Sequence, residues 1–340
     1  MATETGTVTG TPEHPTVRGA GAGQWRYAAK RAQHGFVRHR GIDSAAALAY
    51  FAALTAFPAS LAIVSAIAIY QGKDGAYRLV LSIAEEVLQP STVEVLREPL
   101  EQLFSIGNPG IALGIGLLLS LWTLSGYSTA FGRAVNTAYE VLEGRALWKF
   151  RGLMLLVAAF LFLPLGAAAA CLIITPNILL ITAGDAAEPW VLAWSIARWP
   201  LAIVLIGLAI AVLYYATPNV RHERIRWVSH GALFAIIVSS LATGAMALYV
   251  STVAPYDRIY GWLGGGIAVL LWLYIINLVA VFGAEVDAEV MRLRQLNSGI
   301  PAEETVQVPV RDTTRNLALA KQLADDIAEG RSIREAAERG

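Results

Sequence analysis

The sequence predicts an all-α, polytopic membrane protein with six transmembrane helices, and three observations support this fold class. Six long runs carry almost no charge, and each exceeds the roughly 20 residues that cross a hydrocarbon core of about 30 Å. Hydrophobic residues make up 56% of the chain and charged residues 15%, with a mean hydropathy of +0.52, which leaves too little polar surface for a water-soluble globule. Lys and Arg gather in alternate connections, which predicts that both termini are cytoplasmic.

These patterns divide the chain into three parts. Residues 1–24 are rich in Thr, Gly, Pro and Ala, so we expect a disordered tail. Residues 25–295 form the membrane domain, and residues 296–340 form a cytoplasmic linker and a short helical tail. Within the membrane domain, the predicted spans are residues 44–72, 110–132, 152–176, 192–216, 228–252 and 261–285. The first span starts too late and is too long for a cleavable signal peptide.

A basic helix is expected just before the first span. Its cations recur every four residues, at Arg26, Lys30, His34 and Arg38, while Trp25, Ala29, Ala32 and Phe36 occupy another face. This pattern favours an interfacial helix that meets anionic headgroups, and the alternative is an ordinary basic stretch retained on the cytoplasmic side.

Two further amphipathic segments lie outside the spans. The acidic external segment 73–108 predicts two short helices that cover the bundle, with Pro90 and Pro99 as breakpoints. In the tail, one amphipathic helix is expected to end near Gly330, and Ser332 with Glu335 fits a capping box that opens a last short helix.

The second span carries a polar stripe. Ser125, Thr129 and Arg133 step by four residues, and Asn136 follows by three. Polar groups at membrane depth must face protein or water, which favours a hydrophilic cavity that opens to the cytoplasm, with Arg133 attracting an anion. In the alternative interpretation, the hydroxyls bond to carbonyls of their own helix and Arg133 extends to the membrane surface.

Other spans contribute prolines and polar groups. Pro58 in the first span and Pro164 in the third predict helix kinks, which either border a cavity or only shape the bundle. Asn277 in the sixth span is expected to bond between helices. Glu285, near the end of that span, is expected to pair with a cytoplasmic arginine such as Arg133 or Arg221, and a proton or cation relay is the alternative.

The sequence shows no pattern typical of catalysis. The five histidines lack a metal-binding spacing, and Glu285, Asp287 and Glu289 alternate by two, which spreads them around a helix. We therefore expect no catalytic residue, no metal and no cofactor. Cys171 is the single cysteine, so an intramolecular disulfide is excluded.

Several segments together resemble a known family. They are Leu48 to Phe51 with Pro58, Tyr214 to Arg221, Trp227 with Gly231 to Leu233, Tyr260 with Gly261, and Leu270 to Tyr274 with Gly283 to Glu285. Over residues 25–295 the chain resembles the YihY/BrkB family. The resemblance implies a six-helix bacterial inner-membrane protein, linked in some members to envelope phenotypes and serum resistance, and historically called ribonuclease BN. A nuclease needs carboxylates or histidines clustered around a phosphate, and the sequence shows no such cluster.

The leading functional hypothesis is that the bundle transports or accommodates an amphiphilic or anionic envelope component, such as an anionic lipid, through a polar cavity. The alternative is a membrane scaffold for envelope biogenesis that recruits enzymes through its tail, and a ribonuclease is a minor third hypothesis. The expected partners are membrane lipids and not nucleic acid, and the sequence is compatible with a homo-oligomer.

Overall fold

The described part of the chain is α-helical and carries one isolated β-bridge. The computed structural model describes residues 21–87, 93–94, 97–98, 101–102, 104, 108–176, 178, 180, 188–221, 229–252 and 263–339. Its helices are α1 (Ala22–Arg38), α2 (Gly41–Val87), α4 (Pro109–Ala138), α5 (Leu147–Ile173), α7 (Glu188–Ala216), α8 (His230–Thr252), α10 (Leu263–Asn297) and α11 (Thr314–Arg339).

Six of these helices are long and apolar enough to cross a membrane, which confirms the predicted fold class. They are α2, α4, α5, α7, α8 and α10. Four of them, α4, α5, α7 and α8, begin and end close to the predicted spans. Helix α2 continues from the predicted end at residue 72 to Val87, and α10 continues from the predicted end at residue 285 to Asn297. The extension of α10 carries several charged side chains, and it positions the candidate site described below.

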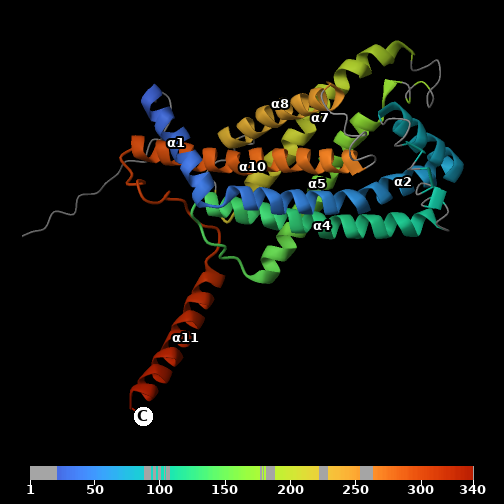
Figure 1. The fold of residues 1–340 in the computed structure, drawn as a ribbon. Helices are drawn as coiled ribbons and strands as arrows, with labels where there is room; N and C mark the ends of the chain where they lie inside the picture. The colour runs from blue at the N-terminus through green and yellow to red at the C-terminus, as the bar shows by residue number, and fades with distance from the viewer. Residues whose placement is uncertain are drawn as a thin grey trace, which may run out of the picture.

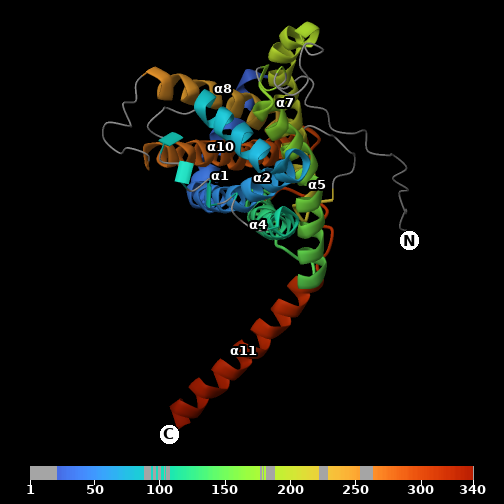
Figure 2. The same ribbon diagram turned by 90° about the vertical axis from the view of Figure 1, so that its right-hand side faces the viewer.

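The bundle is built from neighbouring helix pairs. Helix α2 lies along α4, α8 along α10 and α5 along α7, while α10 also contacts α2 (Figures 1 and 2). Helix α1 packs on the C-terminal half of α10, and α11 projects away from the bundle (Figure 1).

Burial is concentrated at one end of the bundle, which we call the tail end. Here α4 and α7 end and α5 begins, and the segment 298–313, which we call the strap, connects α10 to α11. From residue 279 to residue 293 of α10 every side chain is buried or half-buried. At the opposite end, the far end, residues 265–271 of the same helix are all exposed except the half-buried Ala268.

Helix α2 departs from helical geometry at Gly72, where φ is 75° and ψ is 165°. A left-handed φ suits glycine, which lacks the Cβ that disfavours it. Gly72 is also the residue at which the first span was predicted to end. Pro58 and Pro164 lie inside α2 and α5, and their role as kinks stays a prediction. Pro90 and Pro99 lie outside the described residues.

The basic helix α1 buries one face against the bundle. Ala28, Ala32, Gly35 and Phe36 are buried, and the Phe36 ring meets Phe282 of α10 edge-on at 5.5 Å. Ala32 and Phe36 belong to the predicted apolar face, whereas its other two members, Trp25 and Ala29, are exposed. Small residues at this spacing allow α1 to approach α10 closely, so the buried stripe is shifted toward Ala28 and Gly35.

The predicted division of the tail helix is wrong. Helix α11 runs without interruption from Thr314 to Arg339. The Ser332 hydroxyl donates to the Glu329 carbonyl at 2.7 Å, which is a bond within a helix and not a cap. The cap at the true start is Asp312, whose Oδ1 accepts from the Thr314 amide at 2.8 Å.

Candidate functional site

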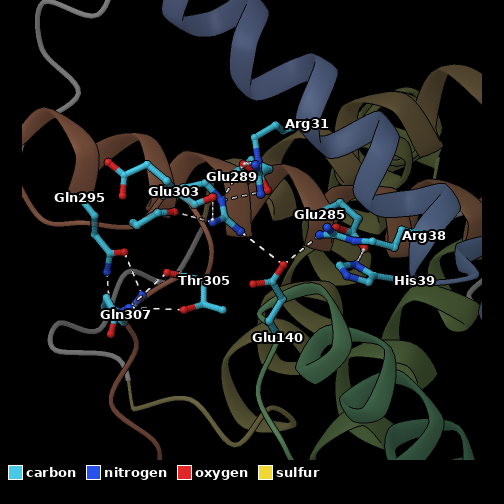
Figure 3. A network of polar contacts seen from close by, with 12 residues as sticks. Arg31, Arg38, His39, Glu140, Glu285, Glu289, Gln295, Glu303, Thr305 and Gln307 are labelled. Carbon is cyan, nitrogen blue, oxygen red and sulfur yellow. Dashed lines mark hydrogen bonds and ion pairs between the residues drawn. The ribbon is translucent and has the colours of Figure 1, made fainter.

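The tail end contains a network of buried charged side chains, most of them on α10 (Figure 3). Glu285, Asp287, Glu289 and Arg292 each expose less than a tenth of their surface. Their alternating spacing does spread them around the helix, as the sequence indicates. At this end, however, α10 is surrounded by α1, α8, the end of α4 and the strap, so each direction offers a different polar partner.

Glu285 pairs with a histidine and not with an arginine. His39, the residue that ends α1, lies with Nδ1 2.8 Å from Glu285 Oε1. The expected partner Arg133 is exposed to solvent, and Glu285 has no contact with it or with Arg221 among the described residues. The prediction of an arginine partner is therefore wrong. The side of α10 that carries Glu285 faces α1, whereas Arg133 points away from the bundle.

Glu289 joins α1 to the centre of the network. It accepts from Arg31 Nε at 3.2 Å and from Arg292 Nε at 3.0 Å. Although partial burial opposes it, the Glu289 carboxylate raises the pKa of the Arg31 guanidinium. The carboxylate thus links α1 and α10 through two cations.

Arg292 is almost completely buried, with 1% of its surface exposed. Besides Glu289, it contacts Glu140 Oε1 at 3.5 Å and donates to the strap carbonyls of Ala302 and Glu303. Glu140 follows the end of α4 with a positive φ of 57°, and it also accepts from Arg38 at 2.9 Å. Glu140 Oε1 therefore contacts two guanidinium groups, those of Arg38 and Arg292.

Asp287 faces α8, away from the Glu285 and Glu289 contacts with α1. Its Oδ1 accepts from the Gly231 amide, in the first turn of α8, at 2.8 Å. A carboxylate at a helix N-terminus satisfies one of the free amides there and complements the helix dipole. Asp287 therefore fixes the start of α8 on α10.

The strap is not the free linker that the sequence predicts. Gln295 holds the backbone of Gln307 from both sides, donating to its carbonyl at 2.6 Å and accepting from its amide at 3.0 Å. Ala302 and Val306 are buried, and Val310 forms an antiparallel bridge with Val220. The strap thus binds across the tail end as an extended peptide does.

A second polar cluster fixes the strap to the ends of α4 and α7. Asn136 Oδ1 accepts from the Asn219 amide at 2.7 Å, and Asn219 Nδ2 donates to the Asp312 carbonyl at 2.9 Å. Arg145 binds Glu143 and donates to the Thr217 carbonyl at 2.6 Å. Asn136, predicted as a cavity contact, thereby lies in a junction of three chain segments.

Of the remaining predicted cavity residues, two on α4 bond within their own helix and one on α10 bonds between helices. Ser125 donates to the Trp122 carbonyl at 2.7 Å and Thr129 to the Ser125 carbonyl at 2.8 Å. Asn277 accepts from the Tyr127 hydroxyl at 2.8 Å, which joins α4 to α10. The structure does not bring Arg133 together with this group, and the role of these residues as substrate contacts stays a prediction. A small hollow at the far end contains none of them; it is lined by Leu61, Val64, Ser65, Ala68, Lys73, Phe104, Pro109 and Ala112.

The described residues offer no evident metal centre. Within the ranges given above, no group of three or more His, Cys, Asp and Glu side chains is arranged to hold an ion. Glu285, Asp287 and Glu289 each bond to a protein partner. The arrangement is suited to joining helices.

Sequence reasoning missed His39, Glu140, Arg292 and the strap as parts of one site. The signal for Arg292 was its place one turn after Glu289, which allows an ion pair on one helix. The contacts of His39 and Glu140 join positions more than one hundred residues apart, and helical periodicity cannot indicate such pairs. The strap contacts are closer in sequence, but the strap has no regular secondary structure whose period could indicate them.

Comparison with known proteins places this bundle in a family. The sequence model of the family described as "Virulence factor BrkB" matches residues 32–306. The chain belongs to the BrkB virulence-factor family. The match begins within α1 and ends within the strap, so it includes most of the tail-end network of this BrkB family member, with Arg31 and Gln307 just outside it.

Several curated relatives are similar to the chain. A protein of Bacillus subtilis named putative ribonuclease-like protein YfkH is 27% identical over 77% of this chain and 94% of its own length. UPF0761 membrane proteins of Azotobacter vinelandii and Chromohalobacter salexigens are 26% and 31% identical over 77% and 74% of this chain. The matches cover only 61% and 60% of those two proteins. No solved structure matches the chain. Six apolar helices and relatives named as membrane proteins establish a multi-pass membrane protein.

Proposed function

We propose that this protein accommodates an amphiphilic, anionic envelope lipid, whose acyl chain enters the bundle sideways at the far end. The observation that carries the proposal is the change in burial along α10. Side chains 279–293 are all covered, whereas Ile267, Val269, Leu270 and Leu271 are exposed by 40% or more. Successive residues of a helix point in all directions, so this part of α10 is uncovered around most of its circumference.

The neighbouring helix α8 shows the same gradient. Gly231, Ala232 and Ala235 are buried near its start, and most residues from 241 to 249 are exposed. The two helices still touch there, because the Trp272 indole donates to Thr243 at 3.1 Å. The far halves of α8 and α10, which we call the hairpin, thus present an exposed apolar surface. Such a surface suits acyl chains.

The proposal predicts preferential contact with lipid at the hairpin. In nanodiscs that contain a photoreactive phosphatidylglycerol, we expect crosslinks at residues 265–271 and 241–249 to exceed those at Leu155, Leu156 and Phe160 of α5. These α5 residues are also exposed and apolar, so they report ordinary surrounding lipid. Equal labelling of both surfaces would refute the proposal.

The preference for anionic over neutral lipid needs a separate test. The exposed cation Arg133 lies near the tail end, so labelling at the hairpin does not report on it. We propose that Arg133 contacts the anionic headgroup of a second lipid, in the leaflet on that side. Arg133→Ala should lower the ratio of phosphatidylglycerol to phosphatidylcholine retained on purification, and Thr137→Ala, an exposed change one turn away, should not. An unchanged ratio in Arg133→Ala removes this residue from the proposal.

The membrane and orientation also belong to the proposal. We place the protein in the bacterial inner membrane with its tail end and both termini in the cytoplasm, because Lys and Arg concentrate on that side. Alkaline phosphatase fused after Gly340 should be inactive and a fluorescent protein there should be bright. The reverse result would invert the orientation.

A scaffold is the second candidate, and α11 favours it. This helix has no buried residue in the structure and exposes Leu317, Leu323 and Ile327. We would expect removal of residues 314–340 to abolish the envelope phenotype of a deletion strain while hairpin labelling persists. Full complementation by the shortened chain would exclude the scaffold.

A nuclease is the third candidate and rests only on the name of the Bacillus relative. The buried carboxylates of α10 bond to protein groups, which leaves them poorly placed to surround a phosphate. Purified protein incubated with Mg²⁺ and labelled RNA should leave the RNA intact. Cleavage that co-purifies with the protein and is lost in Glu285→Gln would overturn this expectation.

A further inference from the structure

The ion pairs at the contact between α1 and α10 are unevenly distributed. Six charged side chains meet there: Arg31, Arg38, Arg292, Glu140, Glu285 and Glu289. Glu140 and Glu289 each contact two arginines. Glu285 contacts none of them, and its one polar partner among the described residues is His39. The compensating charge for this carboxylate therefore depends on the proton state of a histidine.

Helix α1 itself covers Glu285. The carboxylate is 3% exposed and lies against the α1 backbone at Gly35, where an added Cβ would come within 2.6 Å of Glu285 Oε2. The same glycine accepts a hydrogen bond from the His39 amide at 2.8 Å. Docking of α1 thus removes water from the carboxylate, and burying an uncompensated charge is costly.

Other charged groups near this pair are already matched. On the α2 side, Arg40 and Asp43 form an exposed ion pair of their own. On α10, Asp287 turns to the Gly231 amide and Arg294 to His230. At the end of α4, Glu140 is held by Arg38 and Arg292. None of these groups supplies Glu285 with a cation.

We propose that His39 and Glu285 form a proton-binding site that controls the docking of α1 on α10. With His39 protonated, the pair is ionic and α1 stays docked. Loss of that proton leaves one buried negative charge with only a neutral donor, and α1 detaches so that water reaches Glu285. Acid supplies the proton that makes the pair ionic and therefore favours docking, and alkali opposes it. This inference does not depend on the proposed lipid function.

The test measures the distance between α1 and the end of α4. Spin labels at the exposed Gln33 and Thr137, in a Cys171→Ala chain reconstituted in nanodiscs, report the position of α1 by pulsed electron resonance. At about pH 6 we expect one short distance, and at about pH 8.5 a second, longer population, because imidazole changes charge between these values.

Two variants distinguish an effect of protonation at this pair from an effect of altered helix packing. Glu285→Gln removes the charge that needs compensation, so the short distance should persist at both pH values. His39→Gln keeps a donor but no titration, so its distance distribution should not change with pH.

The matched control is His34→Gln. His34 is an exposed histidine on the same helix, so this variant should respond to pH as the unmodified chain does. The proposal fails if the unmodified chain shows no change between the two pH values. It also fails if His39→Gln shifts as the unmodified chain does. Size-exclusion chromatography of each variant confirms that the bundle is folded.

Discussion

Gly231 of α8 and Gly283 of α10 lie backbone to backbone at the tail end. A Cβ added at Gly231 would overlap the Gly283 carbonyl, and one added at Gly283 would lie 2.7 Å from the Gly231 carbonyl oxygen. In a membrane, where apolar surface gains nothing by leaving lipid, such close contacts supply much of the attraction between helices. These two glycines therefore fix the point from which α8 and α10 extend.

Alanine at either glycine should destabilise the bundle. Gly231→Ala and Gly283→Ala force the helices apart, which we expect to lower the free energy of unfolding by about 1–3 kcal/mol. Gly244→Ala and Gly266→Ala are matched controls on the same helices, because an added Cβ meets nothing within 4 Å there. Thermal unfolding in detergent measures the difference. Equal melting temperatures for all four variants would contradict the close contact.

Removal of the Arg292 side chain should be among the most damaging single changes at the tail end. Arg292→Ala leaves the Ala302 carbonyl without its donor and Glu289 and Glu140 with one arginine each. Breaking a buried ion pair typically costs about 3–5 kcal/mol. Arg334→Ala, which removes an exposed partner of Glu338, should change stability by less than about 1 kcal/mol. Chemical denaturation in micelles compares the two variants, and similar midpoints would rule out the buried role.

The position of a C-terminal truncation should decide its effect. A chain that ends after Thr313 loses only α11, which buries nothing, and should melt as the full chain does. A chain that ends at Asn297 also loses the strap and thus the partners of Arg292 and Gln295, so its melting temperature should fall. Identical melting of the two shortened chains would show that the strap does not stabilise the bundle.

Acid should loosen the start of α11. The hydroxyl and amide of Thr314 stabilise the Asp312 carboxylate and lower its pKa below the usual range. The capping hydrogen bonds are therefore present at pH values above the ordinary aspartate pKa of about 4, and they are lost as the pH falls through the lowered pKa of Asp312. Hydrogen exchange at the Thr314 amide, corrected for intrinsic rates, should accelerate in this window. Asp312→Ala should exchange fast at every pH, and protection unaffected by that variant would refute the cap.

The six spans could be predicted because each obeys a local rule. A run of apolar residues long enough for the hydrocarbon core needs no knowledge of its neighbours, and the alternation of basic loops adds an orientation. The break at the end of the first span was likewise visible in Gly72 and the charges that follow it.

The tail-end network could not be predicted in the same way. Glu285 was recognised as a paired carboxylate, but the choice between His39 and Arg133 depends on how α1 folds back onto α10. The strap appeared to be a linker because its buried residues, Ala302 and Val306, are few, and its binding relies on backbone groups that any sequence supplies. For the α4 stripe, a periodic pattern alone does not distinguish hydroxyls bonded within their helix from hydroxyls that line a cavity.

The unbroken course of α10 has a mechanical consequence. Its 35 residues make a rod of about 52 Å at 1.5 Å per residue, roughly 20 Å longer than the hydrocarbon layer. A rigid helix that is packed at one end and largely exposed at the other acts as a lever. Pressure from lipid on residues 265–271 would therefore be felt some tens of ångströms away, at Glu285 and the helix that covers it.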